Sequence, residues 1–488
     1  MVASAFFTCQ QLYAQNQVLT KVNGGTSWHG VAGDANIKAK QTTNLTSPAH
    51  PNSEIIVPFQ SEEYDASNNF DPITGVFTPT EEGYYYIIAS VNWRNSSTAV
   101  FRRSIELVQN GVTVVERNFE DNAGNSHFSI CALVHNSGGD DFRIRVSHNS
   151  NSSQTISGSS NAGESTFTAF GLTDFDRDIL KKKNGGATWE SGTNMNTKIR
   201  AWGSNALTLP TGFSTIGFST ENYDVKNNFN HVSGVFTPPE AGYYVISADL
   251  IWSNISGSSS IQLLKNGSTA SVYEQNTDFR SGGLLHSTLN SVIYSDGTDN
   301  YRIGVWHNMS PSTVIIDREF SAFRINGPSD LILTKLGGGA SWSSEISCVK
   351  AKRTSNMTIP SSTNTSITYS SEDFDANNEF DQSTGMFKPN MTGYYVIMAT
   401  ANWDNFNGNV GNRGIQLMKK IGGGSGVPQK INRQRGSNIM TSKLHTVVYY
   451  DGTPNTSYYM QAFQDSGSNH DIGGTPSSPG CTFIAYKL

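Results

Sequence analysis

The chain has 488 residues, a formal net charge of −6 and only 15% charged residues, which excludes a strongly basic nucleic-acid-binding surface. Aromatic residues make up 11% of the chain, which argues against disorder, and the abundance of Gly, Ser, Thr and Asn favours an all-β protein with many turns. No apolar run approaches the ~18–20 residues that span a bilayer, so membrane insertion is not predicted.

Residues 1–17 precede the first repeated landmark and form a short arm that includes Phe6, Phe7 and Leu12. The arm has no basic start and no long apolar stretch, so no signal peptide is predicted. Two interpretations stay open. The arm is either a disordered leader or an anchoring strand that adds to a sheet edge of another protein.

Three segments then open in the same way, each with a glycine pair followed closely by a tryptophan. These tryptophans are Trp28, Trp189 and Trp342, so the landmark recurs about every 150–160 residues, the size of an independent domain. That period is far longer than the roughly 20–50 residues of a solenoid repeat. The sequence therefore predicts the arm followed by three tandem domains, with the boundaries 18–174, 175–329 and 330–488.

The strongest repeated signature lies at residues 70–79, 229–238 and 380–389. It reads Phe-x-x-x-x-Gly-x-Phe-x-Pro, with Asp71, Asn230 and Asp381 at the second position, and a Gly-Tyr-Tyr strand follows in each copy. Asn-Gly pairs between apolar runs add hairpin signals, and no long segment has helical periodicity. The pattern predicts β structure throughout each copy.

The strand that begins with Gly-Tyr-Tyr has two faces with different character. One face, Tyr85 to Trp93 in the first copy, is apolar in every copy and is predicted to face the domain core. The other face is apolar only in its first half, although the outer face of an antiparallel sheet is ordinarily solvated. A covering loop is one explanation. The other is an inter-domain seam formed by Tyr84, Tyr86, Ile88, Tyr243, Val245, Tyr394, Val396 and Met398.

With the closing strands at 167–170, 320–323 and 483–486, these landmarks resemble the C1q-like globular head, which belongs to the same jelly-roll group as tumour-necrosis-factor ligands. The resemblance covers the chain after the arm. It implies an all-β fold class with three tandem jelly-roll β-sandwiches. Because family members form homotrimers, it also implies that the three copies arrange as an intramolecular pseudo-trimer. Some members bind calcium, so calcium is kept as a candidate cofactor, without a ligand set in this chain.

The resemblance also makes the first and last strands of a copy neighbours, so Cys348 and Cys481 could form a disulfide. Two buried reduced thiols are the favoured alternative. Cys131 aligns with Asn290 and His445, and no thiol position is shared between copies. A repeated metal site or nucleophile is therefore not predicted.

Two further groups of residues have ordinary structural interpretations. The acidic residues Glu62, Glu63, Asp65 and Asp71 recur as part of the fold signature, so turn formation or cation binding is favoured over catalysis. His127 is equivalent to His286 and is expected to make ordinary hydrogen bonds. No catalytic, cofactor-binding or metal-binding residue is predicted, no ligand-binding residue is assigned, and the protein is predicted not to be an enzyme.

The sequence thus favours a non-enzymatic structural or adhesive protein of a virion surface, either a bacteriophage capsid decoration (a head fibre) or the receptor-binding tip of a tail fibre. The expected partners are other virion or appendage proteins, bound through residues 1–17, and a glycan or protein of the host surface. The alternative is a secreted or cell-surface C1q-like adhesin or lectin that binds glycans or proteins.

Overall fold

The structure is a computed structural model, and every regular element in its described ranges is a β-strand. The same ranges contain no helix that is long and apolar enough to cross a bilayer. The described residues are 17–22, 25–30, 37–51, 53–65, 68–80, 82–94, 101–122, 126–158, 165–172, 178–183, 186–191, 197–253, 256–267, 272–281, 284–309, 313–325, 331–336, 339–343, 347–404, 411–436, 440–473 and 481–487.

Sandwich 1 packs two antiparallel sheets face to face. Its inner sheet has the order β4-β14-β9-β15-β3-β6, with β12 beside β9, and its outer sheet has the order β11-β10-β13-β8-β7, with β5 beside β13. The strands are β3 (Ile37–Lys40), β4 (Leu45–Ser47), β5 (Ile55–Ile56), β6 (Ser61–Asp65), β7 (Phe70–Asp71), β8 (Val76–Phe77), β9 (Gly83–Arg94), β10 (Phe101–Gln109), β11 (Thr113–Asn122), β12 (Ser126–Asn136), β13 (Phe142–His148), β14 (Gln154–Ile156) and β15 (Thr166–Gly171).

Sandwich 2 repeats this arrangement, with the inner sheet β21-β18-β29-β24-β27 plus β19 and the outer sheet β22-β23-β28-β25-β26 plus β20. Its single long β29 takes the place of two strands of sandwich 1, β14 and β15. The strands are β18 (Lys198–Gly203), β19 (Leu207–Leu209), β20 (Gly212–Thr215), β21 (Thr220–Asp224), β22 (Phe229–Asn230), β23 (Val235–Phe236), β24 (Ala241–Ser253), β25 (Ser256–Lys265), β26 (Val272–Ser281), β27 (Leu285–Asp296), β28 (Tyr301–His307) and β29 (Thr313–Arg324).

Sandwich 3 has the inner sheet β33-β43-β38-β44-β32-β35 plus β41 and the outer sheet β36-β37-β42-β39-β40 plus β34. Its strands are β32 (Cys348–Arg353), β33 (Met357–Ile359), β34 (Thr365–Ser366), β35 (Ser371–Asp375), β36 (Phe380–Asp381), β37 (Met386–Phe387), β38 (Gly393–Trp403), β39 (Gly411–Ile421), β40 (Val427–Gly436), β41 (Met440–Tyr450), β42 (Thr456–Gln464), β43 (His470–Ile472) and β44 (Cys481–Lys487). The all-β jelly-roll class predicted from the sequence is confirmed.

The repeated signature explains part of each fold. Gly75 adopts a φ of +70°, and a Cβ there would collide with the carbonyl oxygen of Val57, so only glycine fits. Gly234 and Gly385 have the same conformation and the same close approach to a backbone oxygen. The signature phenylalanines then stack on the closing strand in each core. The stacked pairs are Phe70 with Phe167 at 5.1 Å, Phe229 with Phe320 at 4.6 Å, and Phe380 with Phe483 at 5.0 Å between ring centroids.

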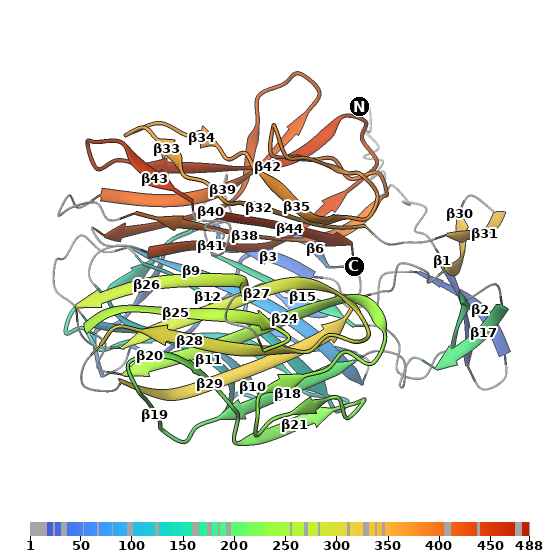
Figure 1. The fold of residues 1–488 in the computed structure, drawn as a ribbon, viewed down its shortest axis with the longest axis horizontal. Coiled ribbons are helices and arrows are strands. Elements are labelled where there is room, and N and C mark those ends of the chain that lie inside the picture. The colour runs from blue at the N-terminus through green and yellow to red at the C-terminus, as the bar shows by residue number, and fades with distance from the viewer. Residues whose placement is uncertain are drawn as a thin grey trace, which may run out of the picture.

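The segments that open the three copies form a separate small sheet. They are three hairpins, β1 (Gln17–Val22) with β2 (Gly25–Gly30), β16 (Asp178–Lys183) with β17 (Gly186–Ser191), and β30 (Leu331–Leu336) with β31 (Gly339–Ser343). Their first strands β1, β16 and β30 all pair with one another. Figure 1 shows this sheet to one side of the three sandwiches. The predicted boundaries placed each hairpin with its own sandwich, whereas the hairpins pair among themselves. Of the predicted arm, residues 1–16 lie outside the described residues.

Candidate functional site

The three sandwiches share a fourth apolar core, here called the central cluster, in addition to one core each. It is built from the second face of the Gly-Tyr-Tyr strands β9, β24 and β38 and from their neighbours. Its members are Tyr86, Ile88, Cys131, Leu133, Phe170, Tyr243, Val245, Val292, Phe323, Cys348, Val396, Met398, Val447, Ile484 and Tyr486. Six of the eight residues proposed for a seam lie in this cluster, and the other two, Tyr84 and Tyr394, pack against it.

Aromatic pairs at the rim of the cluster run around the molecule in one direction. Tyr84 of sandwich 1 lies 4.8 Å from Tyr223 of sandwich 2, measured between ring centroids. The equivalent Tyr243 of sandwich 2 lies 5.0 Å from Phe374 of sandwich 3. Tyr394 of sandwich 3 closes the ring at 4.6 Å from Tyr64 of sandwich 1. Each copy therefore presents one surface to the next copy and a different surface to the previous one. This defines seams 1–2, 2–3 and 3–1.

An edge strand of each outer sheet extends every seam. Strand β11 contacts β27, β26 contacts β41, and β40 contacts β12, again in cyclic order. These strands cover the polar half of the Gly-Tyr-Tyr strands, so Ser90, Asp249 and Thr400 are all buried. Each seam therefore includes the polar half of the Gly-Tyr-Tyr strand as well as the apolar half. The sequence indicated only the apolar half.

Three different polar residues occupy one equivalent position at the centre. Cys131 pairs in register with Ile88, Asn290 with Ser247, and His445 with Met398. The Sγ atom of Cys131 lies 3.1 Å from Nδ1 of His445 across seam 3–1. Burial raises the pKa of the Cys131 thiol well above its usual value and lowers that of His445 to about 3. The thiol and the imidazole are therefore both neutral, and this buried pair lacks the thiolate that a nucleophile requires.

At seam 3–1 a lysine spans the interface. Lys430 of β40 is 1% exposed, and its Nζ donates to the hydroxyl groups of Ser90 and, at 2.7 Å, Thr166 of sandwich 1. The two hydroxyls lie opposite each other on β9 and β15 and 3.1 Å apart. A single ammonium group thus bridges two strands of the neighbouring sandwich.

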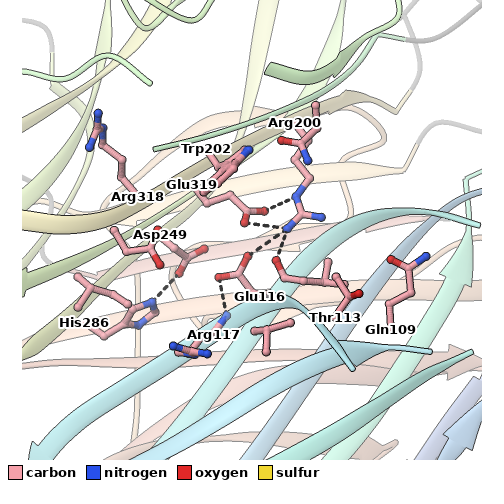
Figure 2. A pocket seen from close by; sticks show the side chains of 15 residues that line it. Gln109, Thr113, Glu116, Arg117, Arg200, Trp202, Asp249, His286, Arg318 and Glu319 are labelled. Carbon is pink, nitrogen blue, oxygen red and sulfur yellow. Dashed lines mark hydrogen bonds and ion pairs between the residues drawn. The ribbon is translucent and has the colours of Figure 1, made fainter. Parts of the chain in front are cut away.

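At seam 1–2 the equivalent positions hold carboxylates. Glu116 replaces the lysine, because it pairs with Leu107 as Lys430 pairs with Leu417. Asp249 and Glu319 replace the two hydroxyl residues and are likewise register partners. Arg200 donates to both carboxylate oxygens of Glu319 at 2.8 Å and lies 3.9 Å from Glu116 (Figure 2).

This cluster lines a cavity of about 400 Å³ between sandwiches 1 and 2. Burial, with the nearby Glu319 carboxylate, raises the pKa of Glu116 well above its ordinary value. Burial also raises the pKa of Asp249 to about 7 and lowers that of His286 to about 3. The lining holds four acidic side chains, Glu116, Asp249, Asp317 and Glu319, and three arginines, Arg117, Arg200 and Arg318.

The candidate disulfide between Cys348 and Cys481 is wrong, because both are free buried thiols. Strands β32 and β44 are neighbours, as the resemblance implies, but Cys348 pairs with Tyr486 and Cys481 with Arg353. The two cysteines lie at opposite ends of the strand pair, about 17 Å apart along it. They also face opposite sides, since Cys348 belongs to the central cluster and Cys481 to the core of sandwich 3.

Aspartates of the signature make turns, whereas Glu63 forms ion pairs with Lys38 at 2.8 Å and with Lys40 at 3.4 Å. Asp65 accepts from the backbone N–H of Phe70 at 2.9 Å, and Asp224 and Asp375 do the same for Phe229 and Phe380. In the part of the chain that the structure describes, no group of three His, Cys, Asp or Glu residues is placed to hold a metal, so the candidate calcium has no ligand set there.

His127 and His286 make ordinary polar contacts, as predicted. The Nδ1 atom of His127 lies 3.0 Å from Oδ1 of Asn92, and Nδ1 of His286 lies 3.2 Å from the hydroxyl of Thr288.

Glu116, Glu319 and Lys430 were not singled out from the sequence as site residues. Each lies on a strand whose partner across the seam is distant in sequence. The available signal was the replacement of a hydroxyl by a carboxylate at one position of an otherwise repeated pattern, as at Asp249 and Glu319 against Thr400 and Thr482.

Comparison with known proteins matches residues 38–172 to the model of the C1q domain family. Residues 38–172 form a C1q-like jelly roll. Sandwiches 2 and 3 repeat its strand order and its signature, so the chain carries the C1q-like sandwich three times in tandem.

A curated relative, the uncharacterized protein V7 of the Sputnik virophage, is 29% identical over 124 residues. That match covers 25% of this chain, and the chain spans about half (51%) of the relative's length. Among solved structures, the globular domain of the zebrafish complement 1qA protein aligns with 16% identity and a TM-score of 0.23, covering 27% of this chain and 98% of that one.

Proposed function

We propose that this protein is a non-enzymatic structural or adhesive component of a virus particle, in which one chain supplies a complete trimer-like head at the particle surface. The observation that carries the proposal is the central cluster, where apolar side chains of all three sandwiches are buried together. An assembly that C1q-like domains otherwise reach by joining three chains is thereby available to a single chain. The virophage relative supports the viral setting.

In this proposal the two ends of the molecule have different tasks. Residues 1–17 attach the head to another virion protein, as a strand added to a sheet edge. The sandwiches face outward, where their loops meet a glycan or protein of the host surface. Capsid decoration and the tip of a tail fibre are two versions of the same role.

The test is to purify particles from the source culture and to measure the protein's copy number against the major capsid protein by quantitative mass spectrometry. We expect a fixed stoichiometry, and immunogold electron microscopy then distinguishes labelling of the shell from labelling of a fibre tip. Protein found only in the particle-free medium would overturn the proposal and favour the secreted adhesin or lectin.

A second experiment addresses attachment. A chain that lacks residues 1–17 should unfold at the same temperature as the full chain but should no longer be incorporated into particles. If the shortened chain is still incorporated at the same stoichiometry, these residues are not the anchor.

A further inference from the structure

The cavity at seam 1–2 has the size of a small-molecule site, and both sandwiches contribute to it. Its volume of about 400 Å³ lies within the range in which proteins bind small ligands. Glu116 and Arg117 reach it from β11, whereas Asp249, His286 and Glu319 reach it from sandwich 2 (Figure 2). The cavity is complete only because the two sandwiches meet there.

Two buried carboxylates in this cavity have oxygen atoms without a hydrogen-bond donor. Glu116 and Asp249 are each 6% exposed, and neither Oε2 of Glu116 nor Oδ1 of Asp249 accepts a hydrogen bond. The basic nitrogens within 4 Å are Nη2 of Arg200, 3.9 Å from Glu116, and Nε2 of His286, 3.3 Å from Asp249. Because the pKa of His286 is lowered to about 3, its ring is neutral and supplies no charge. A buried carboxylate ordinarily has a donor, so these atoms favour a positively charged ligand.

Seam 3–1 shows which cation fits this geometry. There the position of Glu116 is taken by Lys430, whose ammonium lies against Ser90 and Thr166, the equivalents of Asp249 and Glu319. The chain thus supplies an alkylammonium at one seam. At the other seam it replaces the lysine by an acid and both hydroxyls by acids.

We propose that the cavity at seam 1–2 binds a primary ammonium group on a short alkyl stem, supplied either by a free alkylamine or by a lysine side chain of a partner protein. The unpartnered oxygens of Glu116 and Asp249 accept from the ammonium. Ile251 and the partly exposed indole of Trp202 line the same cavity and contact the stem. The indole face also attracts a nearby cation.

Other ligand classes fit less well. A divalent metal requires several converging oxygen ligands, and the described residues include no group of three acidic, His or Cys side chains placed for one. A guanidinium group prefers to bind both oxygens of one carboxylate. Arg200 already forms this bidentate interaction with Glu319. An anion would face several acidic side chains. The two other arginines of the lining are already engaged: Arg117 pairs with Glu106 at 2.7 Å, and Arg318 donates to the backbone oxygens of Gly217, Gly203 and Asn205.

The raised pKa values give this site a pH dependence. The charged and titratable groups that face the carboxyls are Glu116 and Arg117 from β11, Arg200 from β18, Asp249 from β24, His286 from β27, Asp317, Arg318 and Glu319 from β29, and Lys443 from β41. A bound ammonium favours the ionised carboxylates. Binding should therefore release protons and become tighter as the pH rises from about 6 to about 8, through the pKa of Asp249.

The test is isothermal titration calorimetry of the full chain with three probes: n-butylamine for the free amine, Nα-acetyl-lysine-N-methylamide for the protein-borne lysine, and n-butanol as the neutral counterpart. We expect saturable binding of at least one amine at one site per chain and none of n-butanol. The amine that binds with the higher affinity indicates whether the ammonium group comes from a free alkylamine or from a lysine of a partner protein. Glu116→Gln and Asp249→Asn should each weaken binding about tenfold, the loss of one charge-assisted hydrogen bond.

Two further variants separate the site from a general charge effect. Glu82→Gln removes the same charge from an exposed position outside the cavity and should leave binding unchanged. Glu116→Lys places a lysine at the position that Lys430 has at seam 3–1 and should abolish amine binding, because the chain then supplies its own ammonium. The proposal is overturned if neither amine saturates, if n-butanol binds equally well, if calcium binds there and displaces the amine, or if Glu116→Gln and Asp249→Asn bind as the wild type does.

Discussion

The cores inside the sandwiches and the core between them differ in how strictly they repeat. Trp93, Trp252 and Trp403 occupy one equivalent position, and all three indoles are buried in their own sandwich. At the centre, one equivalent position holds Cys131, Asn290 and His445. A separate homotrimer would have to repeat one residue there three times. Joining three copies in one chain removes that constraint and lets each seam have its own chemistry.

The largest expected effect comes from disrupting the central cluster while the core inside each of the three sandwiches is left unchanged. Polar replacement of Tyr84, Val245 and Val396 together, for example by Ser, Asn and Asn, puts unpaired polar groups at the shared interface. Each costs about 1–3 kcal/mol, so the domains should loosen from one another while each sandwich stays folded. We expect a larger hydrodynamic radius and a lower thermal transition.

A matched control places the same kinds of substitution on exposed apolar residues, one in each copy: Ile73, Val232 and Ile421. These changes should alter neither the radius nor the thermal transition. If the central triple variant also unfolds and sediments as the wild type does, the seam assignment is wrong.

The next largest effect is expected from a substitution in the core inside sandwich 2. Trp252→Ala removes a fully buried indole, including its hydrogen bond to Ser287, and should lower the free energy of unfolding by about 3–5 kcal/mol. Trp306→Ala, at an indole that is 36% exposed in the same sandwich, should cost far less. Urea unfolding followed by near-ultraviolet circular dichroism measures both. Equal losses would contradict the contrast between the two positions.

A smaller effect is expected at seam 3–1. Lys430→Met keeps the stem but removes the ammonium from Ser90 and Thr166, which can still bond to each other. The free energy of unfolding should fall by about 1–3 kcal/mol. Lys388→Met, at an exposed lysine of the same sandwich, is the control. A stability equal to that of the control variant would show that the bridging lysine adds nothing.

The last expected effect is a pH dependence confined to seam 1–2. The pKa of Asp249 is raised from 3.8 to about 7 in the folded protein, so between these pH values the folded state holds a proton that the unfolded state has released. The wild type should therefore lose stability relative to Asp249→Asn as the pH rises from about 4 to about 7. Urea titrations of both proteins at several pH values measure this difference, and a difference that stays constant across the window would contradict the raised pKa.

The sequence predicted most of what is local or repeated. The all-β class and the inward phase of the Gly-Tyr-Tyr strand follow from alternation and from repetition of the same residues in three copies. The seam residues also followed from alternation, because Val245 and Val396 are apolar where a solvated face was expected. The polar half of the seam could not be predicted in this way. A polar face of a strand gives the same alternation whether water or the edge strand of another copy covers it.

Three other features could not be derived from the sequence for related reasons. Strand adjacency suggested a Cys348–Cys481 pair, but adjacency does not give register, and the register places the two thiols at opposite ends of the strand pair. Glu116 and Asp249 come together only because sandwiches 1 and 2 dock against each other. The pattern within a single repeat does not show how two sandwiches dock. Pairing among the three hairpins likewise joins strands from different copies, β1 with β16 and β30, and β16 with β30.

The covalent joining of the three sandwiches has a consequence for dilution. Three separate chains dissociate when their concentration falls below the dissociation constant of the trimer. Here the neighbouring sandwich is always present at an effective concentration on the order of millimolar, as for domains joined by short linkers. The closed ring of aromatic pairs, Tyr84–Tyr223, Tyr243–Phe374 and Tyr394–Tyr64, should therefore persist however far the protein is diluted.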